Sequence, residues 1–215
     1  MKMIILVGPQ GSGNHLFAKI FSIHKEVTGW KESLTEEGYF IPHWFEPFND
    51  YWNDISLIDK KMMKGNMYAV TSVSNPYMRE RAPKVPDIAA FAKKLKEVGI
   101  DSQVVVIGRD KNIIDLQQRR VRGGPTWGMM QIMLNRIEEP PFFVSQELLY
   151  LYHRQYLRSL EKYLDFPIAW DDPMVEYILS EDANAKYIRQ ADTTWLDSHV
   201  KNFLMKDTTT DGVEE

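Results

Sequence analysis

Cysteine is absent from this chain of 215 residues. Without a thiol the protein can form no disulfide bond, use no thiolate in catalysis and hold no metal through cysteine. The lack of disulfides is compatible with a reducing compartment, and we predict a cytoplasmic location.

Long hydrophobic runs are also lacking. No run approaches the roughly 20 apolar residues that cross a bilayer, so we predict no membrane partner. The first apolar run, Met3–Val7, is short and is followed at once by glycine and proline, so we do not expect it to be a secretory signal peptide. An excess of positive charge is missing too, because 26 Lys and Arg stand against 30 Asp and Glu. The net charge of -4 predicts no nucleic-acid partner.

What is present is an ordinary globular composition, with 44% hydrophobic and 26% charged residues. A chain of this length can bury one substantial core. We predict one domain over residues 1–206 and a disordered acidic tail over residues 207–215. The composition leaves the oligomeric state open.

Short, continuous apolar runs alternate with amphipathic segments along the chain. Strands are predicted at residues 3–7, 67–74, 103–107 and 142–144, with an edge strand at 166–169. Helices are predicted at residues 14–24, 55–63, 86–98, 110–119, 126–136, 145–163 and 192–203, and a long aromatic loop at 25–53. The alternation predicts a three-layer α/β/α sandwich with a central parallel sheet, like that of the P-loop NTPases.

A glycine-rich turn follows the first predicted strand. It reads GPQGSG over residues 8–13, and Gly8 and Gly13 have the spacing of a P-loop. Backbone N–H groups in such a turn bind phosphate without a charged side chain, although an ordinary tight turn between strand and helix would look similar. Asn14 and His15 stand where a P-loop has Lys and Ser or Thr. The Lys contacts the terminal phosphates and the hydroxyl holds magnesium, so a standard ATPase or kinase is disfavoured and no metal is expected.

The stretch PQGSGNHLF, residues 9–17, resembles the phosphosulfate loop of sulfotransferases that use 3'-phosphoadenosine 5'-phosphosulfate (PAPS). The Ser-Gly pair of that loop is intact, and Asn14 replaces its Thr. Residues 24–32, the segment around Arg109 and residues 142–168 resemble later family segments in the same order. The resemblance implies PAPS as co-substrate and transfer of a sulfuryl group to a hydroxyl or amine of a small-molecule or glycan acceptor. Gln10 and Gly11 replace the family's Lys or Arg, and losing such a cation can slow transfer by about 10²–10³-fold.

The resemblance also implies roles for single residues. Arg109, at the end of a buried strand, would anchor the 3'-phosphate through its guanidinium, and Gln117 would add a hydrogen bond. A surface arginine at a strand end is the alternative for Arg109. The cradle for the 5'-phosphosulfate would comprise Gly11, Ser12, Gly13, Asn14 and His15.

Three residues are candidates for catalysis. Glu32 matches the position of a general base in the family segment, but it lies in an acidic stretch that a solvated face would explain. His43 stands among aromatic residues and could equally be a packed loop residue. His15 is the third candidate, directly after the glycine loop.

Two other functions remain open at this point. A divergent P-loop nucleotide or nucleoside kinase is supported by the basic stretch Arg119–Arg122, which looks like a kinase lid but could also be a solvated helix end. A non-catalytic nucleotide-binding relative fits the loss of the loop lysine. The aromatic loop between Trp30 and Trp52 could form an acceptor pocket or pack into the core.

Overall fold

The computed structural model describes residues 1–30, 46–79, 82–122 and 126–180. Residues Met1–Ser180 form one compact unit. The predicted helix at 192–203, the predicted domain end at residue 206 and the predicted tail lie outside the described residues.

Five parallel strands form the central sheet, in the order β2-β3-β1-β6-β7. The first strand occupies the middle of this order, and residues 3–9 within it are all buried. This confirms the expectation that its continuous apolar run lies in a parallel sheet covered on both faces. The strands are β1 (Lys2–Pro9), β2 (Val27–Thr28), β3 (Tyr68–Asn75), β6 (Asp101–Gly108) and β7 (Phe142–Ser145).

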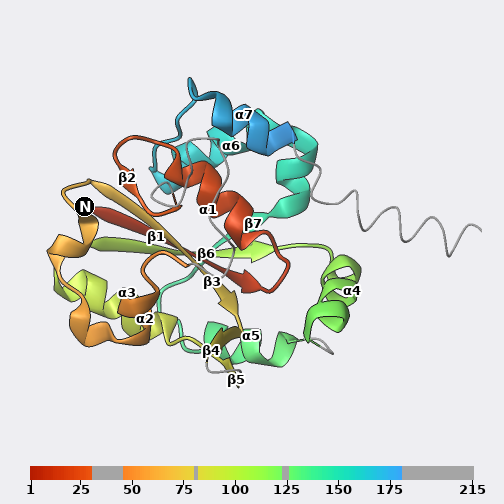
Figure 1. Ribbon diagram of the computed structural model, residues 1–215, viewed down its shortest axis with the longest axis horizontal. Coiled ribbons are helices and arrows are strands. Elements are labelled where there is room, and N and C mark those ends of the chain that lie inside the picture. The colour runs from red at the N-terminus through yellow and green to blue at the C-terminus, as the bar shows by residue number, and fades with distance from the viewer. Residues whose placement is uncertain (31–45, 80–81, 123–125, 181–215) are drawn as a thin grey trace, which may run out of the picture. The chain divides into compact units, whose positions relative to one another are not determined.

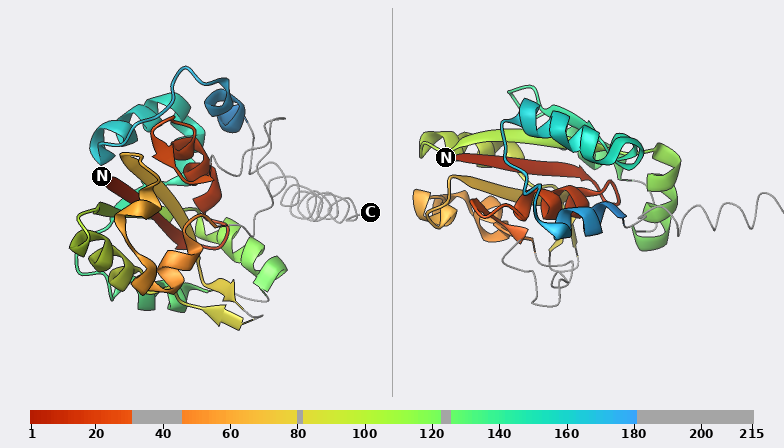
Figure 2. Two further views of the ribbon diagram at one scale, coloured as in Figure 1. Left: turned by 60° about the vertical axis from the view of Figure 1, so that its left-hand side comes forward. Right: turned by 90° about the horizontal axis from the view of Figure 1, so that it is seen from above.

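Helices cover both faces of the sheet, which confirms the predicted three-layer α/β sandwich (Figure 1). Alternate residues of β1 point to opposite faces, so Ile4 and Leu6 contribute to one core and Ile5 and Val7 to the other. The first core contains side chains of α1 (Asn14–Ser22), α6 (Gln146–Leu164) and α7 (Pro173–Ser180). The right-hand view of Figure 2 looks onto this layer. The second core contains side chains of α2 (Asn49–Asn53), α3 (Ile88–Glu97) and α5 (Trp127–Leu134).

The predicted helix at 55–63 is wrong, because two short 3-10 helices occupy the segment, η2 (Ile55–Leu57) and η3 (Lys60–Met63). The Asp54 carboxylate accepts the backbone N–H two residues ahead of it, and the Asp59 carboxylate does the same. Each hydrogen bond closes a tight turn, and the backbone changes direction at that turn. One long helix is therefore replaced by two turns.

The predicted edge strand at 166–169 is also wrong, because the segment forms no strand. Phe166 and Ile168 are nevertheless buried in the first core, so side-chain packing, without strand pairing, accounts for their apolar character. Four elements of the described residues were not predicted: the short strand β2, helix α7, and the antiparallel pair of β4 (Tyr77–Arg79) and β5 (Ala82–Lys84).

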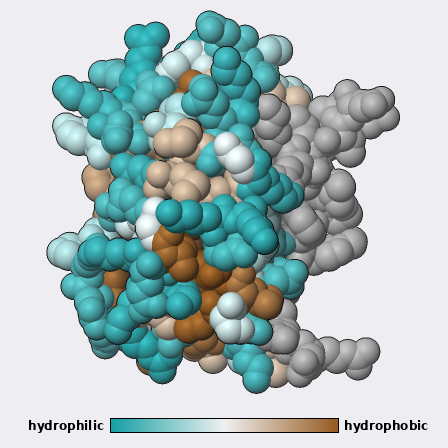
Figure 3. Space-filling model, turned by 90° about the vertical axis from the view of Figure 1, so that its left-hand side faces the viewer, coloured by the Kyte–Doolittle hydropathy of each residue, from teal (hydrophilic) through white to brown (hydrophobic). Residues whose placement is uncertain are grey.

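The surface carries some large apolar side chains. Leu57 and Met67 are more than half exposed. Figure 3 shows one face that is mostly hydrophilic, with hydrophobic residues gathered in its lower half. Within the ranges that the structure describes, no helix combines the length and the hydrophobicity that crossing a bilayer requires.

Candidate phosphate-binding site

The glycine turn joins β1 to α1 at the carboxyl edge of the sheet. Gly11 and Gly13 have φ angles of 91° and 101°, a region that side chains rarely adopt. A Cβ on Gly11 would overlap the Gln117 side chain, and a Cβ on Gly13 would overlap the Gln146 side chain. Both glycines are therefore required by backbone conformation and by close packing.

The first turn of α1 presents backbone N–H groups at this edge. Gly13 is the N-cap residue, and no side chain caps the helix. The Ser12 N–H donates to the Pro9 carbonyl at 3.0 Å, which closes the turn before the helix begins. An uncapped first turn combines orphan donors with the positive end of the helix dipole, so this position suits an anion.

The side chains of Ser12 and Asn14 point into the protein, with exposed fractions of 0% and 4%. Ser12 Oγ donates to Asn14 Oδ1 at 2.8 Å, and Asn14 Nδ2 donates to the carbonyls of Gly8 and Val73 at 3.2 and 3.3 Å. These bonds hold the turn against β3. Both residues were expected in the phosphate cradle. The Ser12 N–H is bonded to the Pro9 carbonyl, so the backbone N–H of Asn14 is the donor that this pair can offer there. Their roles stay a prediction.

His15 lies beside a carboxylate that the sequence did not reveal. Its Nε2 is 2.6 Å from Glu46 Oε1, and the two side chains are 28% and 15% exposed. Ser72 Oγ donates to Glu46 Oε2 at 2.7 Å and accepts from Trp30 Nε1 at 3.0 Å. The Trp30 and His15 rings also touch, with centroids 4.7 Å apart. The imidazole is thus held by a carboxylate on one side and an indole on another.

Helix α4 (Lys111–Arg122) lies beyond the carboxyl ends of β1 and β6 (Figure 1) and contacts the turn. Gln118 is fully buried, and its Nε2 donates to the Gln10 carbonyl at 3.2 Å. Just before the helix, Arg109 Nη1 donates to the Gly11 carbonyl at 2.5 Å. The structure therefore brings Arg109 and Gln117 to the glycine turn. Their predicted bonds to a 3'-phosphate stay a prediction.

A carboxylate on α4 links this helix to α5. Asp115 Oδ1 accepts from Trp127 Nε1 at 3.0 Å, and its Oδ2 is 2.8 Å from Lys111 Nζ. The Lys111 hydrogen bond, together with that from Trp127, holds the pKa of Asp115 below its usual value. The carboxylate is therefore kept charged.

Gln146, the first residue of α6, is the second residue that sequence reasoning missed. It is 4% exposed and packs on Gly13. Its Oε1, like that of Gln117, is buried without a hydrogen-bond partner in the described ranges. If either side-chain amide rotated, its NH₂ group would take the place of its oxygen and would present N–H donors there. Two amide groups therefore border the turn and can adapt to an anion.

The other predicted catalytic residues, Glu32 and His43, lie outside the described residues. Among the residues that are described, no three or more His, Asp or Glu side chains are grouped so that they could hold a metal ion.

No protein-family model matches the chain, and no curated protein matches its sequence. Solved structures that the chain resembles include a gluconokinase from Sinorhizobium meliloti 1021. It is 15% identical with a TM-score of 0.42, over 76% of this chain and 94% of its own. A sugar kinase from Janibacter sp. HTCC2649 is 12% identical with a TM-score of 0.37, over 77% of this chain and 95% of its own.

Proposed function

We propose that this chain binds the phosphate groups of a nucleotide at Gly8–His15 and transfers a terminal group from it to an acceptor hydroxyl. The observation that carries the proposal is the contact of His15 Nε2, in the first turn of α1 after the glycine loop, with Glu46 Oε1 at 2.6 Å. A general base beside an anion cradle is what group transfer to a hydroxyl requires.

The cradle is supplied by the backbone. The loop glycines permit close approach of a phosphate, and the uncapped first turn of α1 offers N–H donors. Arg109, bonded to the Gly11 carbonyl, brings a guanidinium to the loop. It is proposed to offset phosphate charge in place of the missing lysine.

The pair of His15 and Glu46 is proposed to handle the proton. With Nε2 donating a hydrogen bond to Glu46, the imidazole Nδ1 carries no proton. It can therefore take the O–H proton of the acceptor molecule. The acceptor oxygen then forms its bond to the transferred phosphorus or sulfur, while the bond to the nucleotide oxygen breaks and the electron pair leaves with the nucleotide. Glu46 stabilises the imidazolium until its proton returns to solvent. Ser72, bonded to Glu46, positions the carboxylate.

A nucleoside triphosphate, with a phosphoryl group as the cargo, is the first candidate donor. Helix α4 is bonded to the loop through Gln118 and continues into the basic stretch Arg119–Arg122. Cations of this kind offset charge in phosphoryl transfer.

A phosphosulfate nucleotide, with a sulfuryl group as the cargo, is the second candidate. It is favoured by Asn14 and His15 at the positions of the lysine and the magnesium-binding hydroxyl. The proposed acceptor is a small molecule or glycan in either case.

Calorimetry on the full chain distinguishes these candidates. The protein is titrated separately with ATP and magnesium, ADP, AMP and adenosine 3',5'-bisphosphate. The rate at which ADP forms from ATP is then assayed. Binding of ATP together with slow formation of ADP supports phosphoryl transfer. Binding of the bisphosphate at least tenfold tighter than AMP supports sulfuryl transfer. Folded protein that binds none of the four at millimolar concentration would refute the proposed function.

A further inference from the structure

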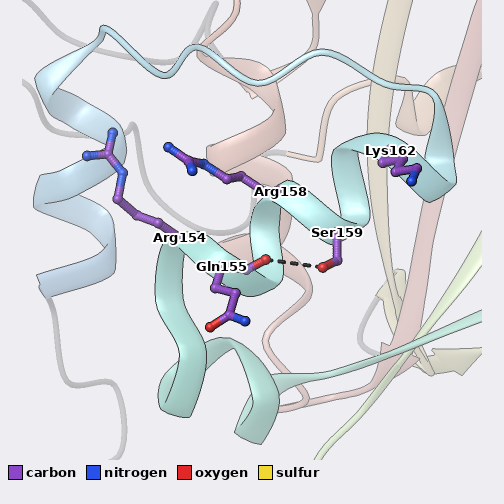
Figure 4. Close-up of a pocket in the computed structure, with 5 residues that line it drawn as sticks. All are labelled: Arg154, Gln155, Arg158, Ser159 and Lys162. Carbon is purple, nitrogen blue, oxygen red and sulfur yellow. Dashed lines mark hydrogen bonds between the residues drawn. The ribbon is translucent and has the colours of Figure 1, made fainter.

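A second cluster of cations lies on α6, on a part of the molecule that the proposed reaction does not use. An open cavity of about 440 Å³ is lined by residues of this one helix (Figure 4). Three of its five lining residues are cations and none is a carboxylate. The lining residues are Arg154, Gln155, Arg158, Ser159 and Lys162.

The three cations recur at every fourth position, so they share one face of the helix and rise about 6 Å from one to the next. Arg158 and Lys162 are exposed, and neither has a hydrogen bond or ion pair within the described ranges. Arg154 is partly neutralised, because its Nη1 is 3.3 Å from Glu176 Oε2. This row therefore carries uncompensated positive charge on a chain whose net charge is -4.

Both guanidinium groups pack on the ring of Trp170. Their carbon atoms lie 5.5 and 5.6 Å from the centroid of its ring, and Arg154 Nη2 donates to its carbonyl at 3.0 Å. The indole is itself fixed, because its Nε1 donates to Glu161 Oε2 at 2.8 Å. The same carboxylate also accepts the Ile168 N–H, so each of its two oxygens accepts a hydrogen bond from the 166–170 segment. Within the described ranges Arg154 is thus paired with Glu176, whereas Arg158 packs on the same indole with no carboxylate partner.

We infer that this cavity on α6 is a binding site for a small anion with at least two negative charges, of the phosphate or pyrophosphate type. Arg158 offers paired N–H groups that match phosphate oxygens, and Lys162 and the partly neutralised Arg154 add positive charge. The Gln155 amide supplies neutral donors at the same wall.

The size and charge of the site favour a small ligand over a nucleic-acid strand. From Arg154 to Lys162 the row rises only about 12 Å, and the acidic molecule around it would repel a long polyanion. A cavity of about 440 Å³ is within the usual range of small-molecule sites.

The test is titration of the full chain with inorganic pyrophosphate, followed by NMR at the α6 amide signals. Pyrophosphate should shift these signals, and the double variant R158Q/K162Q should weaken that binding roughly tenfold or more. A matched control is K61Q/K93Q, which removes the same charge from exposed lysines of η3 and α3. The control should bind like the wild type.

Three results would overturn the inference. The first is that the NMR signals of the α6 amides do not shift at millimolar pyrophosphate. The second is an equal loss of pyrophosphate affinity in K61Q/K93Q. The third is that a 20-nucleotide single strand binds more tightly and displaces pyrophosphate from this face. Nucleotide titrations of R158Q/K162Q measure binding at the glycine loop independently of the cavity on α6. Either proposed site can therefore be refuted while the other is still tested.

Discussion

At the scale of single residues, the candidate site depends on backbone handedness at two glycines and on one pair of side chains. Gly11 and Gly13 let the chain turn with positive φ while two glutamine side chains pack on them. His15 and Glu46 then place an acid–base pair within one helical turn of the loop. The two glycines thus set the shape of the loop, and the His15–Glu46 pair supplies the acid–base groups. Substitutions can change the two separately.

Gly13→Ala is expected to damage the loop itself. The new Cβ would meet an unfavourable φ and the Gln146 side chain, costing about 1–3 kcal/mol of folding free energy. Gly128→Ala on α5 is the control, because nothing lies within 4 Å of the added carbon and alanine favours the helix by roughly 0.5–1 kcal/mol. Urea unfolding measures both. Equal stability of the two variants would contradict the close packing at Gly13.

The double variant G13A/Q146A separates the two causes. Removing the glutamine relieves the overlap but leaves the backbone strain, so we expect partial recovery relative to Gly13→Ala. Full recovery would mean that the positive φ carries no cost.

Glu46→Gln tests the acid–base pair. The amide keeps the shape but cannot stabilise an imidazolium, so turnover should fall by about 10²–10⁴-fold while nucleotide affinity changes little. Asp50→Asn, an exposed carboxylate on α2, is the control and should leave turnover unchanged. Single-turnover rates and calorimetry give the two quantities. A variant that loses affinity and turnover together would assign Glu46 to ligand binding.

The sequence predicted part of this residue set. Arg109 was expected as a phosphate anchor, and the structure places it at the loop through its bond to the Gly11 carbonyl, while its role stays a prediction. Glu46 could not be found, because it stands 31 residues from His15 outside any periodic element. Gln146 was missed since nothing in its local sequence separates a loop contact from an ordinary first residue of a helix. Such contacts are decided by tertiary packing.

At the scale of elements, α4 connects the loop to the rest of the carboxyl edge. The Gln118 side chain donates to the Gln10 carbonyl, and it accepts a hydrogen bond from the Thr126 N–H at 2.7 Å. Trp127 and Asp115 add a second link between α4 and α5. The loop therefore shares a hydrogen-bond network with two helices.

Gln118→Ala should loosen this network. The Gln10 carbonyl and the Thr126 N–H would each lose the bond to this side chain, and a hydrogen bond of this kind contributes about 0.5–1.5 kcal/mol. Hydrogen exchange should accelerate at the start of α5 and at the loop, while α3 keeps its protection. Gln131→Ala, at an exposed position of α5, should change neither. Exchange that is unaltered in both variants would show that α4 does not hold the loop.

Elements were predictable where apolar runs were continuous. Strands β1, β3, β6 and β7 lie close to their expected bounds. For β1 and β6 the reason is that burial on both faces leaves an unbroken apolar run. The β4–β5 hairpin was missed, since its residues include Pro83 and two cations and show no alternation. The carboxylates of Asp54 and Asp59 replaced a predicted helix with tight turns. A pattern of apolar residues does not reveal such local competition.

At the scale of the whole molecule, stability depends on two cores joined by one sheet. The first core extends to α6, where Tyr156 packs against it. The Tyr156 hydroxyl accepts the Ser145 N–H at 2.9 Å, so it connects the body of α6 to the end of β7. A half-buried phenol in this position makes the folding equilibrium sensitive to alkaline pH.

Burial raises the pKa of Tyr156 above its usual value of 10.0, and the Ser145 hydrogen bond opposes the rise only in part. Because the folded pKa exceeds the unfolded one, the stability linked to this group is fully present below pH 10 and is lost as pH rises through the folded pKa. Tyr156→Phe should cost about 1 kcal/mol at neutral pH through the unpaired N–H, and should also remove this alkaline loss.

The stability difference between wild type and Tyr156→Phe should therefore shrink above pH 10. Urea unfolding of both proteins from pH 7 to 11.5 measures this difference, and Tyr163→Phe serves as the control because its side chain is 71% exposed. A difference that stays constant across this range would mean that Tyr156 ionises equally in the folded and unfolded chain. The packing of α6 at this position would then be looser than the structure has it.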